Sequence, residues 1–388
     1  MFKKNSFLGF WVYSLCAVSF YCCILINAKI LEDFFAYEHL SFYDYDHIEF
    51  LKMLGYVLAS AIIVLFTSIL SFYRVVLIAM PLNFLCCFFI ILFELDDAIM
   101  TLSLIVYGAT SMMMVLLFID KMFELRRSKK LNLVILLPAE MLISYIIIVY
   151  FNLYNIDKIF EDLDMIYIFK ANIIPLFVFC LMVFSFKGFR SKRDNEDYNF
   201  NIVIRNMELE SLMAFVVFFT LMSIRNGYEV FSLSHQMHSV SSETISFICF
   251  SAIVIPVILF KFFLSKRNIH KTNITSLVCL ILLFLLLSVL GQNSMFLIIN
   301  LMFIGVSIML FFIGNIFILS RKFEGINFTS ALAIYALAAS MGYYCGYITS
   351  DTSEETLGPN GFLISICFVL TSLLLYYLYL FKKLKLYR

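Results

Sequence analysis

Twelve apolar runs recur along this chain, and each is long enough to cross a lipid bilayer as a helix. A membrane-spanning helix needs about 20 apolar residues. Helices are expected at residues 7–29, 51–72, 74–93, 98–119, 131–151, 164–186, 210–231, 244–263, 273–291, 295–319, 326–349 and 361–381. Hydrophobic residues make up 63% of the chain and charged residues 14%, which is more apolar surface than a water-soluble core can hide. The sequence therefore predicts an all-α polytopic membrane protein.

One long polar segment, residues 187–209, divides the runs into two groups of six. It is basic where it leaves the sixth run, at Lys187, Arg190, Lys192 and Arg193. The following stretch, NFNIVIRNMELE, is amphipathic and is expected to form a short surface helix before the seventh run. This layout predicts an N-terminal six-helix bundle at 1–186, a linker at 187–209 and a C-terminal six-helix bundle at 210–388, a 6+6 arrangement.

The distribution of charges along the chain predicts its topology. If the N-terminus is cytoplasmic, 23 of the 28 basic residues fall in cytoplasmic segments, and 18 of the 27 acidic residues fall in external ones. Cytoplasmic loops of membrane proteins carry such an excess of Lys and Arg. The first run has no evident small-residue cleavage site and is expected to remain as a helix. We therefore expect both termini in the cytoplasm, a bacterial inner membrane, and the longer external segments at 30–50, 152–164 and 350–360.

The 6+6 layout resembles that of the major facilitator superfamily of secondary transporters, and the resemblance covers nearly the whole chain. The signature of that family, a Gly, an Asp and paired basic residues after the second helix, would fall at FTSILSFYRVV, where Arg74 alone remains. The matching loop of the second half, FKFFLSKRNIHKTN, keeps Lys266 and Arg267 but lacks the glycines. The resemblance implies two halves that rock about a central site, which opens to one face at a time. It identifies no subfamily.

Glu140 lies near the middle of the fifth run, LNLVILLPAEMLISYIIIVYF. A charged side chain at mid-bilayer costs about 2.5–3.5 kcal/mol on insertion scales, unless it faces a wet cavity or a partner. Removal from water also favours the protonated form of a carboxyl group, so such a group can exchange a proton near neutral pH. One interpretation is a proton-coupling or cation-binding site. The alternative is a protonated glutamic acid that holds helices together by hydrogen bonds.

Two basic residues are also expected inside the membrane. Lys170, in the outer half of the sixth run, is interpreted either as a side chain that snorkels to the surface or as a partner of Glu140 or of an anionic substrate. Arg225, in the seventh run, can bind a carboxylate or phosphate through two hydrogen bonds, or pair with Glu229 one turn later. Two cations against one acid favour an anionic or zwitterionic substrate.

By the same resemblance, the first, fourth, seventh and tenth helices line the central cavity. The polar residues and the glycine that they offer are Tyr13, Ser19, Tyr21, Asn27, Tyr107, Gly108, Ser111, Asn226, Asn300, Ser307 and Asn315. Of these, Tyr21, Tyr107, Asn226, Asn300 and Asn315 are predicted to bind substrate. The alternative for each Asn is an interhelical hydrogen bond, and either role requires it to face the bundle interior. Gly305, Gly314, Gly342 and Gly346 are expected to allow close helix packing.

Other motifs are too weak to carry chemistry. The ten cysteines lie in apolar runs without a CxxC pair, and His235 and His238 form an HxxH pair without a third ligand. His39 and Asp44 match the HxxxxD pattern of some acyltransferases once, in a tyrosine-rich loop. We find no nucleotide-binding fingerprint and no long basic helix for nucleic acid. We therefore expect no metal, no cofactor and no enzymatic activity.

These features together predict a secondary active transporter of a small polar, anionic or zwitterionic metabolite. Its expected partners are that substrate, protons and membrane lipid, and it is expected to be a monomer. An exporter of lipophilic compounds remains open, because an interior rich in aromatic residues and methionine suits varied shapes. A transporter-like sensor without turnover remains open as well, because the signature loop is degenerate.

Overall fold

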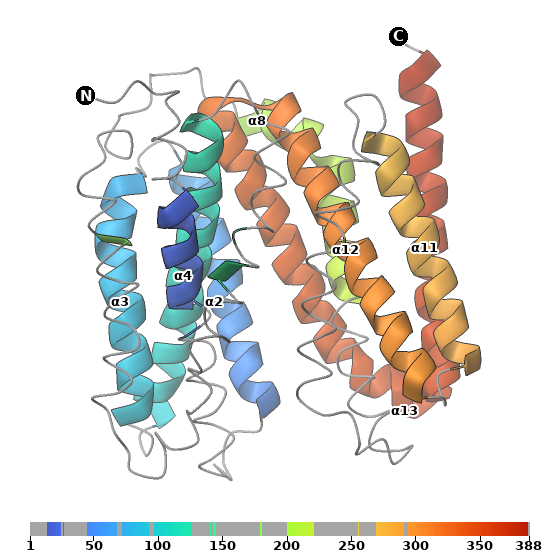
Figure 1. The fold of residues 1–388 in the computed structure, drawn as a ribbon, viewed down its shortest axis with the longest axis horizontal. Helices are drawn as coiled ribbons and strands as arrows, with labels where there is room; N and C mark the ends of the chain where they lie inside the picture. Colours follow the sequence, from blue (N-terminus) through green and yellow to red (C-terminus); the bar gives the residue numbers. More distant parts are fainter. Residues whose placement is uncertain are drawn as a thin grey trace. The chain divides into compact units, whose positions relative to one another are not determined.

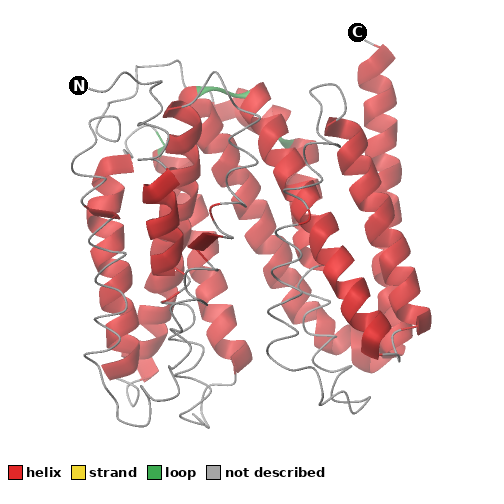
Figure 2. Ribbon diagram, in the orientation of Figure 1, coloured by secondary structure: helices red, strands yellow, loops and turns green. Residues whose placement is uncertain are grey.

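The computed structural model describes residues 14–24, 26, 45–67, 72–92, 97–125, 140, 143–144, 179–180, 200–220, 255, 269–290 and 294–386. Within these residues the chain is helical apart from short connections (Figure 2). The helices are α2 (Tyr45–Phe66), α3 (Phe72–Leu92), α4 (Asp97–Leu125), α8 (Phe200–Asn206), α11 (Ile269–Leu290), α12 (Ser294–Lys322) and α13 (Gly325–Leu386) (Figure 1). Two further helical stretches cover 14–24 and 208–220.

Five of the described helical stretches are long and apolar enough to cross a membrane. They are Ala98–Lys121, His270–Val289, Met302–Lys322, Gly325–Thr349 and Gly361–Leu380. Each overlaps a helix expected from the sequence, because a continuous apolar run can satisfy its backbone hydrogen bonds in lipid only as a helix. The prediction of an all-helical integral membrane protein is confirmed, while the twelve-span 6+6 arrangement stays a prediction.

The expected loop at 350–360 was wrong in part. α13 continues as a helix through most of this segment and is interrupted at Gly358, whose φ of 69° and ψ of 165° are not helical. Glycine populates positive φ without the steric penalty that a Cβ brings. The polar run DTSEETLGPN therefore continues the eleventh expected span as a helix. The helix then breaks at Gly358, before the twelfth expected span begins. Hydropathy cannot distinguish such a polar helical extension from a loop.

The chain packs as two compact units. Unit 1 comprises Met1–Asn199 and Glu324–Ala333, and unit 2 comprises Phe200–Phe323 and Ile334–Arg388. The first turns of α13 therefore belong to unit 1, although most of this helix belongs to unit 2.

In unit 1, α2 and α4 cross at a pair of glycines. A Cβ added to Gly55 of α2 would lie 2.3 Å from the carbonyl oxygen of Ile105, and one added to Gly108 of α4 would lie 2.3 Å from that of Lys52. Small residues at such crossings let helix backbones approach closely, which is a main source of helix association in lipid. Gly108, which the resemblance placed at the cavity wall, is thus a packing residue here.

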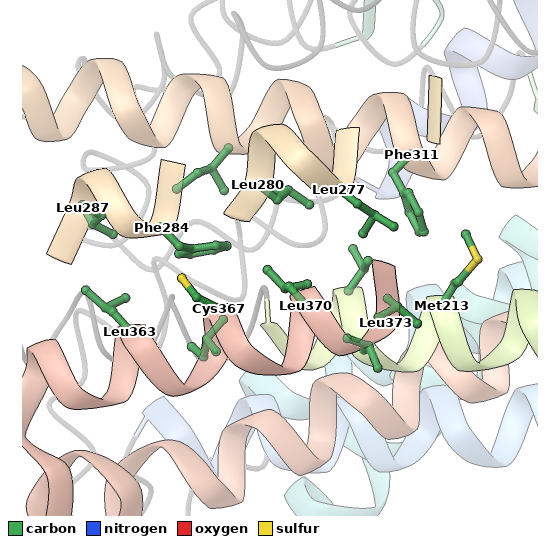
Figure 3. Close-up of a cluster of buried hydrophobic side chains, with 14 of the residues drawn as sticks. Met213, Leu277, Leu280, Phe284, Leu287, Phe311, Leu363, Cys367, Leu370 and Leu373 are labelled. Atoms are coloured by element: carbon green, nitrogen blue, oxygen red, sulfur yellow. The ribbon is translucent and has the colours of Figure 1, made fainter. Parts of the chain in front are cut away.

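In unit 2, α11 and the second part of α13 enclose an apolar core (Figure 3). Side chains that the two helices turn toward each other are Leu277, Leu280, Phe284 and Leu287 of α11, and Leu363, Cys367, Leu370 and Leu373 of α13. Met213 of the 208–220 helix and Phe311 of α12 extend this core. The packing holds these helices in a fixed register, which positions the polar side chains described below.

The short surface helix expected in the linker is present as α8. Val203 is fully buried, whereas Ile202 and Ile204 are exposed. The chain then turns at Met207, whose amide donates to the carbonyl of Ile204 at 3.0 Å, and continues as the 208–220 helix. α8 is therefore amphipathic and packs against unit 2, the unit to which it belongs.

Candidate functional site

Among the charged residues that the sequence predicted to carry chemistry, Glu140 is the one that the structure describes. Its exposed fraction is 2%, and it lies in helical backbone within unit 1. Its carboxyl group interacts electrostatically with the Cys16 thiol and the Tyr21 hydroxyl, both on the 14–24 helix. Tyr21 was predicted to bind substrate, and the structure brings it together with Glu140.

Ser144 fastens the Glu140 segment to the 14–24 helix. Its hydroxyl is 2.8 Å from the carbonyl oxygen of Glu140 and 3.0 Å from that of Val18. The thiol of Cys22 lies 3.8 Å from the carbonyl oxygen of Ser144. A serine hydroxyl has one proton, and here it is shared between two carbonyl oxygens, one in its own helix and one in the neighbouring helix. The segment that carries Glu140 is therefore held against the 14–24 helix.

Three buried phenylalanines and Tyr21 form the apolar wall beside this segment. Phe20 stacks on Phe118 of α4 with ring centroids 4.9 Å apart, and its ring lies 5.6 Å from that of Phe179. Tyr21 meets Phe118 edge to face at 6.3 Å. Such aromatic pairs are worth about 0.5–1.5 kcal/mol beyond their buried area. These buried rings make the surroundings apolar, and an apolar environment strengthens any electrostatic interaction of the carboxyl group.

The second polar cluster of unit 1 centres on Asn83 of α3, which the sequence analysis missed. Its amide nitrogen lies 3.2 Å from the carbonyl oxygen of Tyr107, 3.0 Å from Thr110 Oγ1 and 2.8 Å from Ser111 Oγ, all on α4. An Asn within an apolar run was the available signal, because an amide in lipid needs a partner. The cluster engages Tyr107, which was predicted to bind substrate, through its backbone carbonyl.

A third buried polar group lies at the end of α4, where a cytoplasmic loop had been expected from residue 121. α4 continues to Leu125, and Asp120 and Lys121 are each 2% exposed. Thr329, in the first turns of α13, donates a hydrogen bond to Asp120 Oδ1 at 2.8 Å. Phe123 and Phe328 pack beside this bond, with ring centroids 5.2 Å apart. Hydropathy ended the helix too early because it treats every charged residue as exposed.

In unit 2, Asn300 and Asn315 are buried, as predicted for residues that face the bundle interior. Asn300 Nδ2 donates to the carbonyl of Leu283 at 2.8 Å, and Asn315 Oδ1 accepts from Asn273 Nδ2 at 2.9 Å. These contacts favour the interpretation as interhelical hydrogen bonds. Two of the predicted packing glycines are confirmed as well, because a Cβ on Gly314 would lie 2.2 Å from Asn273 Oδ1 and one on Gly342 would lie 2.1 Å from the carbonyl oxygen of Phe215.

The remaining predicted site residues, Lys170, Arg225 and Asn226, lie outside the described residues. The same holds for the histidine pair at 235 and 238 and for the HxxxxD motif at 39–44.

No family model matches the chain. A protein from Rickettsia prowazekii (strain Madrid E), described as uncharacterized, is 26% identical over 397 residues, with full coverage of both chains. Among solved structures, the transporter FucP of the major facilitator superfamily in its outward conformation superposes with a TM-score of 0.70, at 12% identity, over 96% of this chain and 98% of that one.

Two further solved structures agree with this result. The nucleoside transporter NupG gives a TM-score of 0.65 at 12% identity, over 96% of this chain and 99% of that one. The human organic anion transporter MFSD10 gives a TM-score of 0.60 at 10% identity, over 94% of this chain and 97% of that one. This chain has the major facilitator fold. The resemblance noted in the sequence is thus confirmed at the level of the fold, without a subfamily.

Proposed function

We propose that the chain is a secondary active transporter that moves a small polar, anionic or zwitterionic metabolite by alternating access, coupled to protons at Glu140. The single observation that carries this proposal is a carboxyl group with an exposed fraction of 2% inside a helix bundle of the major facilitator fold. Burying a carboxyl group there is costly. A role in proton transfer explains why the position holds an acid rather than an apolar residue.

In the proposed cycle, Glu140 binds a proton when the central site opens to one face and releases it at the other. Arg225 and Lys170 hold the anionic part of the substrate. The two six-helix bundles, 1–186 and 210–388, rock about the site, and the linker at 187–209 joins them in the cytoplasm. The solved proteins with this fold include a fucose:proton symporter, a nucleoside transporter and an organic anion transporter, which support a polar solute and proton coupling.

The surroundings of Glu140 support the proton role in a second way. Cys16 and Tyr21 are neutral proton donors within electrostatic reach of the carboxyl group, and Ser144 fixes the backbone that carries it. Removal from water favours the protonated form of a carboxyl group, so a group in such a pocket can take up a proton near neutral pH and give it up when the site opens to water. Reversible proton binding of this kind is what coupling requires.

Flux in proteoliposomes tests the proposal. The purified protein is assayed with a panel of sugars, nucleosides, amino acids, organic anions and lipophilic cations, with and without an imposed pH gradient. Wild type is expected to accumulate one polar class when the gradient is present. Glu140→Gln is expected to retain binding and exchange but to lose accumulation, because the amide cannot carry the proton. The control is Glu208→Gln, which alters an exposed carboxylate.

The possible results separate the functions. Gradient-driven accumulation that survives Glu140→Gln removes this residue from the mechanism. Transport confined to lipophilic cations replaces the proposal with an exporter, and binding without flux for every compound replaces it with a sensor.

A further inference from the structure

Unit 2 holds a chain of polar side chains that the proposed mechanism does not use. Its centre is the hydrogen bond between Asn273 of α11 and Asn315 of α12, which are both fully buried. Two asparagines facing each other in lipid-buried helices are costly unless all of their hydrogen-bonding groups find partners.

One end of the chain reaches the surface. Asn273 interacts with the hydroxyl of Tyr377 in α13, and that hydroxyl lies 2.7 Å from His270 Nδ1. Tyr377 is 2% exposed, whereas His270, in the first turn of α11, is exposed. The polar groups thus lead from solvent at His270 into the interior of unit 2.

The chain of polar side chains continues to Tyr335 and Glu210 and ends at Lys322, which is exposed. Tyr335, also 2% exposed, interacts through its hydroxyl with Asn315, about three helical turns into α13. The carboxyl group of Glu210, at the start of the 208–220 helix, interacts electrostatically with Tyr335 and Tyr377. One of its oxygens pairs with the ammonium of Lys322.

Within the described residues, no hydrogen bond of ordinary geometry reaches four buried polar atoms of this group. They are Asn273 Oδ1, Asn315 Nδ2, Tyr335 OH and Glu210 Oε2. Rotating both side-chain amides by 180° would exchange donor and acceptor in the Asn273–Asn315 bond. The amide nitrogen of one asparagine and the amide oxygen of the other would still lack a partner. The surplus is therefore a property of the residues and not of their assigned orientation.

These surplus atoms match the hydrogen-bonding capacity of water. Asn273 Oδ1 and Glu210 Oε2 accept hydrogen bonds, Asn315 Nδ2 donates, and the tyrosine hydroxyl can do either. A water molecule donates two hydrogen bonds and accepts two. Gly314 helps to leave the Asn273 oxygen accessible, because a Cβ at this position would lie 2.2 Å from that oxygen.

We propose that Asn273, Asn315, Tyr335 and Glu210 bind buried water, and that this water is connected to the surface through Tyr377 and His270. The site is a route by which water and protons reach the interior of unit 2, separate from Glu140 in unit 1. It does not depend on the proposed transport function, because it follows from the side chains alone.

Hydroxyl-radical footprinting of the intact protein in nanodiscs tests the proposal. Radicals formed from bound water modify buried side chains next to it, so Tyr335 and Tyr377 are expected to be labelled several-fold more than Phe311 and Phe317. These two phenylalanines are buried to the same extent in α12 and serve as internal controls. Rapid mixing with ¹⁸O water before irradiation is expected to place ¹⁸O in the label, because the site exchanges with bulk water.

Three results would overturn the inference. Labelling of Tyr335 no higher than that of Phe311 would show that no water is bound. Label without ¹⁸O would show that the site is closed to the surface. In Gly314→Ala, the added methyl group is expected to occupy the space beside Asn273 and to abolish most of the label on Tyr335. Unchanged labelling of Tyr335 in this variant would place the water elsewhere. Asn315→Leu provides a second variant if the alanine variant does not fold.

Discussion

The glycine pair between α2 and α4 makes a quantitative prediction about stability. In Gly55→Ala, the new methyl group would lie 2.3 Å from the Ile105 oxygen, and in Gly108→Ala it would lie 2.3 Å from the Lys52 oxygen. Real Cβ atoms essentially never approach another heavy atom within 3.0 Å, so the two backbones must separate by at least the difference, about 0.7 Å. Overpacking of this kind costs about 1–3 kcal/mol. Each single variant is expected to lose that much stability.

The double variant gives the sharper test. Both clashes oppose the same approach of α2 to α4, so one separation of the helices relieves both. The double variant is therefore expected to cost less than the sum of the two single variants, with a coupling of about 0.5–3 kcal/mol. Unfolding of the four proteins in lipid bicelles, followed by circular dichroism against denaturant, measures this coupling.

Gly361→Ala is the matched control, because its Cβ would meet only the side-chain atom Leu357 Cβ, at 3.2 Å. This contact requires a shift of only a few tenths of an ångström, and alanine favours the helix over glycine by about 1 kcal/mol. Additive losses for Gly55→Ala and Gly108→Ala would refute the shared-separation argument. Losses no larger than that of the control would refute the close crossing itself.

Two further variants test buried polar contacts. Thr329→Val removes the hydrogen bond to Asp120 and is expected to cost about 0.6–1.7 kcal/mol in the same unfolding assay. Thr371→Val, whose hydroxyl bonds only the carbonyl four residues before it in its own helix, is the control, and an equal loss in both would contradict the interhelical role. Lys322→Met leaves the buried Glu210 carboxylate without its ion partner and is expected to cost up to about 3 kcal/mol. Adding Glu210→Gln should recover most of that loss, and no recovery would show that Lys322 stabilises the fold in another way.

The membrane helices were predictable because their signal is local. Runs such as 273–291 and 361–381 have no alternative to a helix in lipid, and the structure confirms them. Their ends were less predictable. Asp120 and Lys121 are charged, so hydropathy assigned them to a loop, yet α4 carries them into a buried position where Thr329 supplies a partner. That partner is more than 200 residues away in sequence.

The same distinction applies to the candidate sites. Glu140 was found from the sequence because an acid in an apolar run is conspicuous, but its neighbours Cys16 and Tyr21 come from another helix and require the fold. Asn315 was correctly predicted to be buried, whereas its partner Asn273 was not foreseen. Asn83 was overlooked although the same signal was present in its apolar run. Hydropathy identifies costly residues, and only tertiary packing identifies what compensates the cost.

The break at Gly358 has a practical consequence for the predicted topology. A Cβ at this position would meet no heavy atom within 4 Å, and the helix is already interrupted there. A short reporter peptide inserted after Gly358 should therefore leave both flanking helices intact. In spheroplasts, such a tag would be accessible to an impermeant antibody if this segment is external, as twelve spans with cytoplasmic termini require. One glycine thus provides a place from which the orientation of the chain in its membrane can be read directly.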